Sequence, residues 1–245
     1  MATGGKMGFG EIVPKLSQVT EWDTSVNQCL DEGLHYEIRQ TWDGKALDGH
    51  GPIKIWMRWH FQRMIGRPHK RVIRVRIEAP LVDDPEPPSE FAGICKDLYN
   101  YECVELFFAN DKGFYTEVEV GPHGHWLVLL HKGYRQCFND GESLQLEVKN
   151  EWKGGEWHCQ MEIPLAYLPG NVTKFNAYAL HGSDEHRHFE ALHAVTDGTV
   201  AEPDFHNLMF FGKFNTKKII PDGYNRTVFN DLKYGDLWEE ATKES

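Results

Sequence analysis

The sequence predicts an all-β fold, a single antiparallel β-sandwich of about ten strands with short helices at its periphery. Several segments alternate apolar and polar residues with a period of two, which is the pattern of a half-buried strand. Turn residues separate these segments at intervals of roughly 8–12 residues, a spacing typical of sandwiches and barrels. No long segment has the helical period, so we expect strands to form the core.

The clearest strand covers residues 71–79, where Ile73, Val75 and Ile77 alternate with Arg74 and Arg76. In chain order, the expected strands are residues 53–60, 71–79, 103–109, 114–120, 126–131, 143–148, 157–163, 174–180, 187–193 and 208–213. A turn at residues 121–124 predicts a hairpin between the fourth and fifth of these strands. Short helices are expected at residues 25–30, 164–168 and 231–240.

Charged residues on two of the expected strands suggest where solvent lies. Glu117 and Glu119 share one face of residues 114–120, and we expect that face to be wet. Residues 58–76 hold seven basic side chains and no acidic one. We interpret Arg74 and Arg76 as the wet side of a strand that pairs with an acidic neighbour such as 114–120. A nucleic-acid-binding face is the alternative, but no recognised motif accompanies the charge, so we expect no nucleic-acid partner.

The length of 245 residues fits one domain, with a core at about residues 34–215 and decorations at both ends. The formal net charge of −11 argues against polyanionic partners and anionic membranes. The longest apolar runs are only a few residues, too short to cross a membrane, and the start of the chain lacks the apolar region of a secretory signal. The five cysteines are odd in number and never closely paired, which favours reduced thiols. We therefore expect a soluble cytoplasmic protein.

The usual catalytic motifs are absent from the sequence. Histidines are unusually frequent at residues 181–193, which hold four of them. Residues i and i+2 of a strand share a face, so His186 and His188 are the candidate pair of metal ligands. Asp184, Asp204 or Glu190 would complete such a site. The alternative is that these histidines are hydrogen-bonding surface or rim residues.

An aromatic and acidic block contains Tyr99, Asn100, Tyr101 and Glu102. Sugar binding uses this combination, because an aromatic ring stacks on the C–H face of the sugar while polar groups bind its hydroxyls. The alternative is an ordinary strand entry with packed tyrosines. Two carboxylate pairs, Glu102 with Glu105 and Glu117 with Glu119, leave glycoside hydrolysis open as a further alternative.

Six segments in a fixed order carry a resemblance to a known family: residues 77–88, 98–107, 115–124, 157–168, 175–178 and 203–206. The most specific combination is the block Val104-Glu-Leu-Phe107 with Tyr115 and the Gly121-Pro122 turn. Over about residues 50–215, the chain resembles the family 9 carbohydrate-binding modules, and it looks closer still to a small family of cytosolic type without an assigned activity. The resemblance implies a β-sandwich and sugar binding.

In the family 9 modules two tryptophans sandwich a sugar, and calcium ions play structural roles. The resemblance puts Tyr99 at the first aromatic position, Asn100 and Glu102 at the polar positions, and Asn176 in the asparagine strand. Ala179 and Leu180 stand where that family usually has an arginine. The second stacking tryptophan has no counterpart that we can place.

We therefore expect a non-catalytic β-sandwich that binds a saccharide or another polyhydroxylated small molecule. The expected site residues are Tyr99, Asn100, Tyr101, Glu102, Tyr115, Asn176, Arg187 and His206. Tyr99 would stack on the ligand, Asn100, Asn176 and Arg187 would donate to its hydroxyls, and Glu102 would accept from them. We expect no cofactor, with calcium or zinc as the ions left open. A metal-dependent or carboxylate-based hydrolase and a protein-interaction module of unknown partner are the alternatives.

Overall fold

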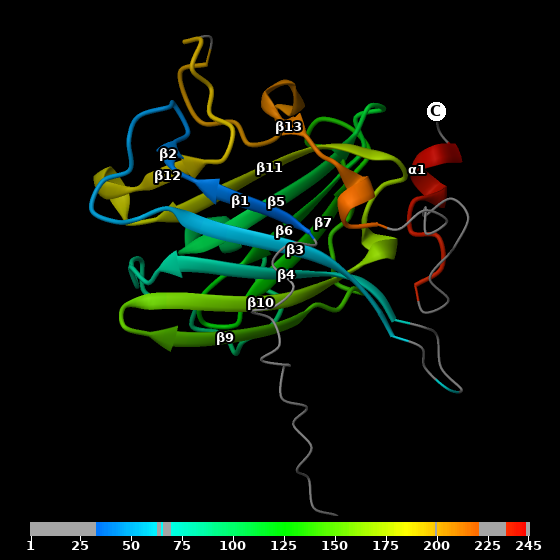
Figure 1. Cartoon of the computed structure of the whole chain (residues 1–245), viewed down its shortest axis with the longest axis horizontal. Helices are drawn as coiled ribbons and strands as arrows, with labels where there is room; N and C mark the ends of the chain where they lie inside the picture. The colour runs from blue at the N-terminus through cyan, green and yellow to red at the C-terminus, as the bar shows by residue number, and fades with distance from the viewer. Residues whose placement is uncertain (1–32, 63–64, 66–69, 199, 221–233, 244–245) are drawn as a thin grey trace, which may run out of the picture. The chain divides into compact units, whose positions relative to one another are not determined.

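Figure 1 shows the computed structural model of the chain, which describes residues 33–62, 65, 70–198, 200–220 and 234–243. All of them belong to one compact unit, Glu32–Ser245. The single domain expected for the whole chain stays a prediction, because residues 1–32 and the helix expected at 25–30 lie outside the described residues.

Two antiparallel sheets form this unit (Figure 1). The first sheet has the order β1 (Leu34–Ile38), β3 (Ile53–Gln62), β4 (Lys70–Pro80), β10 (Glu156–Pro164) and β9 (Glu147–Lys153). The second has the order β2 (Gln40–Thr41), β12 (His188–Ala191), β11 (Val172–His181), β5 (Cys103–Asn110), β6 (Tyr115–Val120), β7 (Trp126–His131) and β8 (Cys137–Asn139). The short strand β13 (Gly212–Lys213) also pairs with β11.

The short helices lie at the ends of strands or in the connections between them. They are η2 (Leu98–Asn100), η3 (Leu165–Tyr167), η4 (Asp184–His186), η5 (Leu208–Phe210), η6 (Thr216–Lys218) and α1 (Glu239–Lys243). The predicted all-β sandwich with peripheral helices is thus confirmed.

The main core lies between the two sheets and follows from the alternation read in the sequence. Ile73, Val75 and Ile77 of β4 are buried there, while Arg74 and Arg76 on the other face are only partly covered. Leu106 of β5 and other residues of the second sheet pack against this apolar face. Burying such side chains is the dominant favourable term in folding, at roughly 25 cal/mol per Å² of apolar surface.

The second sheet does not have one buried and one solvent-exposed face, because its outer face is also covered by other segments. Every residue of β5 and β6 is buried. A second apolar cluster covers this outer face and includes Leu98, Phe107, Tyr115, Tyr178 and Phe211. The expectation that Glu117 and Glu119 face solvent is therefore wrong, since both lie under this cover.

The expected partner of the basic strand is also wrong. The strand β4 pairs with β3 and β10, whereas β6 pairs with β5 and β7 in the other sheet. Arg74 instead binds Glu162 of β10, with Nε 2.7 Å from Oε1, and Lys70 binds the same carboxylate. These ion pairs follow from sheet neighbours that are distant in sequence.

Three expected elements differ from those observed. The strand expected at 143–148 begins only at Glu147, because the hydroxyl of Tyr167 occupies both backbone groups of Gln145, at 2.8 Å from its N and 2.7 Å from its O. Of the strand expected at 208–213, only Gly212–Lys213 is a strand, β13. Residues 208–210 form the 3₁₀ turn η5, which the Asn207 side chain caps by accepting from the Met209 amide. Most of residues 231–240 lies outside the described residues, and α1 covers Glu239–Lys243.

Candidate functional site

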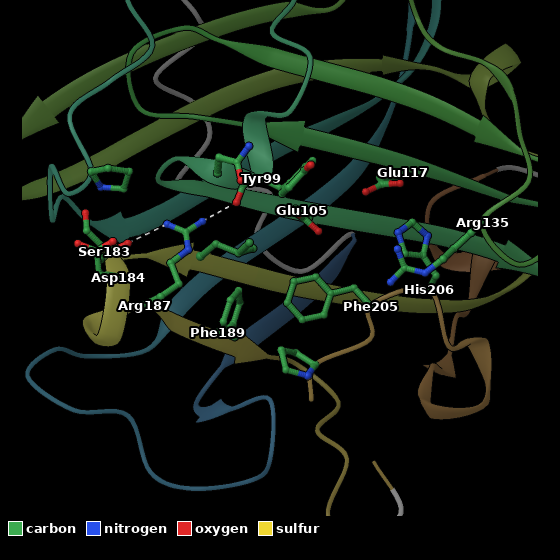
Figure 2. Close-up of a pocket in the computed structure, with 15 residues that line it drawn as sticks. Tyr99, Glu105, Glu117, Arg135, Ser183, Asp184, Arg187, Phe189, Phe205 and His206 are labelled. Atoms are coloured by element: carbon green, nitrogen blue, oxygen red, sulfur yellow. Dashed lines mark hydrogen bonds between the residues drawn. The ribbon is translucent and has the colours of Figure 1, made fainter. Parts of the chain in front are cut away.

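A cavity of about 760 Å³ opens over the outer face of the second sheet (Figure 2). Glu105 of β5 and Glu117 of β6 line it from the sheet itself. Its other walls come from η2 (Tyr99 and Asn100), from the β11–β12 hairpin, from the loop before β8 and from residues 203–206. The size is that of a small-molecule site.

Arg187 links the segments at one rim of the cavity through hydrogen bonds. Its guanidinium donates to the carbonyl oxygens of Gly182 at 3.0 Å and Tyr101 at 2.9 Å, and also to that of Tyr99 (Figure 2). Burial lowers the pKa of this guanidinium, yet arginine remains charged in proteins. The residue therefore fixes η2 against the β11–β12 hairpin and adds positive charge to the wall.

The opposite rim is held by Tyr115, which lies behind His206. The Tyr115 hydroxyl accepts from the Arg135 amide at 3.1 Å and lies 2.8 Å from His206 Nδ1. Asp204 adds a second tie, since its Oδ1 lies 3.0 Å from Nη2 of Arg135. Burial lowers the pKa of His206, which favours its neutral imidazole.

Three carboxyl groups lie together on the outer face of β5 and β6. Glu105 and Glu119 are directly opposite each other in the ladder, and both are almost fully buried. Burial raises the pKa of both carboxyls well above the usual range, and the nearby charge of Glu117 adds to the effect. Glu117 is paired with His131, whose Nε2 lies 3.0 Å from Oε2. A protonated Glu105 can both donate to and accept from a ligand hydroxyl.

Aromatic rings line the cavity beside these polar groups. Phe205 stacks on Tyr178 with a centroid distance of 3.9 Å, and Phe189 meets Phe205 edge to face at 5.9 Å. Tyr99 is half exposed on η2 at the other side (Figure 2). Flat apolar rings and hydrogen-bonding groups therefore face one space.

The structure brings four of the eight expected site residues to this cavity: Tyr99, Asn100, Arg187 and His206. Tyr115 is fully buried and does not line the cavity, but its hydroxyl contacts two residues that do, His206 and Arg135. Arg187 donates to three carbonyl oxygens of the rim, and its expected role toward a ligand stays a prediction.

The other three expected residues lie elsewhere. Glu102 accepts from the amides of Val82 at 2.9 Å and Asp83 at 2.6 Å, so it holds the loop after β4. With Tyr101 it lines a separate, much smaller hollow. Asn176 is fully buried, where it donates to the Tyr178 hydroxyl and the His193 carbonyl.

Reasoning from the sequence missed Phe189, Phe205 and Arg135 as lining residues and gave Glu105 only the role of a hydrolytic carboxylate. Phe205 stands within residues 203–206, one of the segments that carried the family resemblance, so that signal was present. Phe189 and Arg135 carry no local signal.

Among the residues that the structure describes, three groups of side chains could hold a metal ion, because each offers ligand atoms within 4.8 Å of one another: His50, His181 and Glu190; Glu117, His131 and His206; and Cys103, Glu105 and Glu119. The expected pair His186 and His188 is in none of these groups. His186 lies in the turn η4, outside the strand on which the expectation depended, and the ring of His188 stacks on that of His181 at 5.0 Å.

Comparison with known proteins places the chain among curated relatives. It is 35% identical over 210 residues to the UPF0462 protein C4orf33 homolog of Mus musculus, covering 84% of this chain and 100% of that protein. It is 34% identical over 210 residues to UPF0462 protein C4orf33 of Homo sapiens, covering 84% of this chain and 96% of that protein. No family model matches the chain. These relatives confirm the expected likeness to a family without an assigned activity.

Among solved structures, a protein from Bacteroides uniformis provisionally described as carbohydrate-binding overlaps with a TM-score of 0.51 at 16% identity, over 78% of this chain and 91% of that one. A family 9 carbohydrate-binding module from Caldicellulosiruptor kristjanssonii in complex with glucose gives a TM-score of 0.44 at 13% identity, over 73% and 81%. The first of these overlaps supports the sandwich fold. The described residues contain no helix with the length and apolar character needed to cross a membrane.

Proposed function

The chain belongs to the UPF0462 family, and we propose that it binds a saccharide or another polyhydroxylated small molecule in the cavity over its second sheet, without transforming it. The observation that carries the proposal is the lining of that cavity. Aromatic rings stand beside groups that donate to and accept from hydroxyls, and sugars need both kinds of contact.

Each wall supplies a different contact to such a ligand. Phe205 and Tyr99 offer flat rings for the C–H faces, and Glu105 offers a carboxyl group that both donates and accepts. His206 and Arg135 place further hydrogen-bonding groups beside Phe205. The volume of about 760 Å³ suits a ligand of one to a few rings. The carbohydrate binding ascribed to the Bacteroides protein supports this ligand class.

A glycan array with the purified chain tests the proposal, followed by calorimetric titration of the saccharides that bind. We expect Phe205→Ala to weaken binding at least about tenfold, since losing a stacking ring costs on the order of 1.4 kcal/mol. Phe91→Ala is the matched control, because Phe91 is almost fully exposed and does not line the cavity. Failure of all saccharides to bind, or equal losses in the two variants, would refute the proposal.

One observation favours a second candidate function, carboxylate-based glycoside hydrolysis. Glu105 and Glu117 line the same cavity, and the raised pKa of Glu105 suits a general acid. Chromogenic aryl glycosides distinguish the two functions. A hydrolase releases the chromophore and loses that activity in Glu105→Gln, whereas a binding protein releases none.

A further inference from the structure

A second polar cluster lies behind the wall of the cavity. Leu180 of β11 and Phe189 of β12 line the cavity, and the next residue of each strand, His181 and Glu190, points to the opposite face of the sheet. His50, from the segment between β2 and β3 (blue in Figure 1), reaches the same point. Two parts of the chain that are far apart in sequence, the β2–β3 segment and the β11–β12 hairpin, therefore meet here.

The two histidines converge on a single carboxylate oxygen. Nε2 of His50 lies 2.8 Å from Oε1 of Glu190, and Nε2 of His181 lies 3.0 Å from the same atom. Glu190 is only 2% exposed, and its other oxygen, Oε2, is buried without a hydrogen-bond partner. A buried carboxylate oxygen without a partner is costly, so this atom points to a missing ligand.

The second ring nitrogen of His50 is held by the backbone, which fixes the orientation of the ring. Nδ1 lies 2.8 Å from the Gly51 carbonyl oxygen, which can only accept, so Nδ1 carries a proton. With Nδ1 held by the backbone, Nε2 is the ring nitrogen that faces Glu190, where it can donate to the carboxylate or, after losing its proton, bind a metal ion. The Gly51 carbonyl is the kind of outer partner that orients a metal-binding histidine.

We propose that His50, His181 and Glu190 bind a zinc ion, which fastens the β2–β3 segment to β11 and β12. Two imidazoles and one carboxylate are ligands that zinc prefers, whereas calcium and magnesium take oxygen ligands. Tetrahedral zinc with bonds of 2.0–2.1 Å holds its ligand atoms about 3.3 Å apart. The observed separations of 2.8 and 3.0 Å need to open by only a few tenths of an ångström. Three protein ligands leave the fourth position for water.

The cavity cluster of Glu117, His131 and His206 is a weaker zinc site. Nδ1 of His206 is already engaged by the Tyr115 hydroxyl, and only His131 contacts the carboxylate. A test must therefore distinguish zinc bound at this cluster from zinc bound at His50, His181 and Glu190. The site at Glu190 is independent of the proposed saccharide binding, because it lies on the other face of the sheet.

The test is zinc binding by the full chain after stripping with a chelator, measured by competition with a chromophoric chelator. We expect one zinc per chain, and in His50→Ala an affinity weaker by more than about 100-fold, since loss of an outer partner alone costs 10–100-fold. His186→Ala is the matched control, an exposed histidine close in sequence that belongs to none of the clusters, and it should bind as the wild type does.

His131→Ala, which removes a ligand of the rival cavity cluster, keeps the test decisive if His50→Ala fails to fold. X-ray absorption of the zinc-loaded wild type adds a readout that needs no variant. It should show two imidazoles in a nitrogen and oxygen shell at about 2.0–2.1 Å. The proposal is overturned if the wild type binds no zinc, if His50→Ala binds as tightly as wild type, or if His131→Ala alone abolishes binding. It is equally overturned if the absorption spectrum shows sulfur ligands or no imidazole.

Discussion

Replacing Glu119 by glutamine removes one of two carboxyls that face each other under the cover of the second sheet. Glu119 is 1% exposed, lies opposite Glu105, and has its Oε2 buried without a partner. Glutamine keeps the shape but carries no charge. The substitution therefore isolates the cost of ionising this carboxyl in the folded protein.

The sign of the pH effect follows from the raised pKa values of Glu105 and Glu119. Above about pH 4.3 the unfolded chain has lost these protons while the folded chain still holds them. Folding then binds protons, so the free energy of unfolding falls as pH rises, by up to about 1.4 kcal/mol per pH unit for each carboxyl, until the raised pKa is passed.

Glu119→Gln removes one such contribution and relieves the repulsion on Glu105. We expect the variant to gain stability relative to wild type as pH rises, by on the order of 1–3 kcal/mol between pH 5 and pH 8. Urea denaturation at each pH, followed by tryptophan fluorescence, measures the difference. Glu151→Gln on the exposed face of β9 should show none. A wild-type chain that is more stable than Glu119→Gln by the same margin at every pH would refute the reasoning.

Three further substitutions test other parts of the structure. Arg187→Lys should cost about 1–3 kcal/mol of stability and speed hydrogen exchange at residues 98–101, because the single nitrogen of lysine cannot take both the Nη1 and the Nη2 positions from which Arg187 donates. Trp157→Ala should cost about 3–5 kcal/mol in urea denaturation, since Trp157 is fully buried between the sheets. Gly141→Ala should lower the melting temperature more than Gly113→Ala, because both glycines have positive φ but only at Gly141 would a Cβ lie 2.3 Å from a backbone oxygen.

The sandwich could be predicted from the sequence because alternation reports directly on burial. Residues 71–79 and 114–120 are strands, and the Gly121–Gly124 turn joins β6 to β7 as a hairpin. Alternation does not say whether the polar face of a strand is wet, however. Glu117 and Glu119 are buried because segments far away in the sequence cover β5 and β6.

Residues of the candidate site could be predicted only where the neighbouring sequence has an unusual composition. Tyr99 and Asn100 stand in a conspicuous aromatic block and do line the cavity, whereas Glu102 in the same block turns away to hold the loop after β4. Of the zinc candidate, Glu190 could be predicted from the sequence as a possible ligand. His50 could not be predicted, because it is 140 residues away from Glu190 and meets it through the pairing of β2 with β12.

The central claim is that the cavity over the second sheet binds a polyhydroxylated ligand. The most direct test is to follow the backbone amide signals of the isotope-labelled chain by NMR while adding the saccharide that binds best on the array. We predict shifts concentrated at Asn100, Arg187 and Phe205, with saturation at one ligand per chain. Shifts confined to another surface, such as the exposed Trp152 of β9, or no shifts with any saccharide, would contradict the claim.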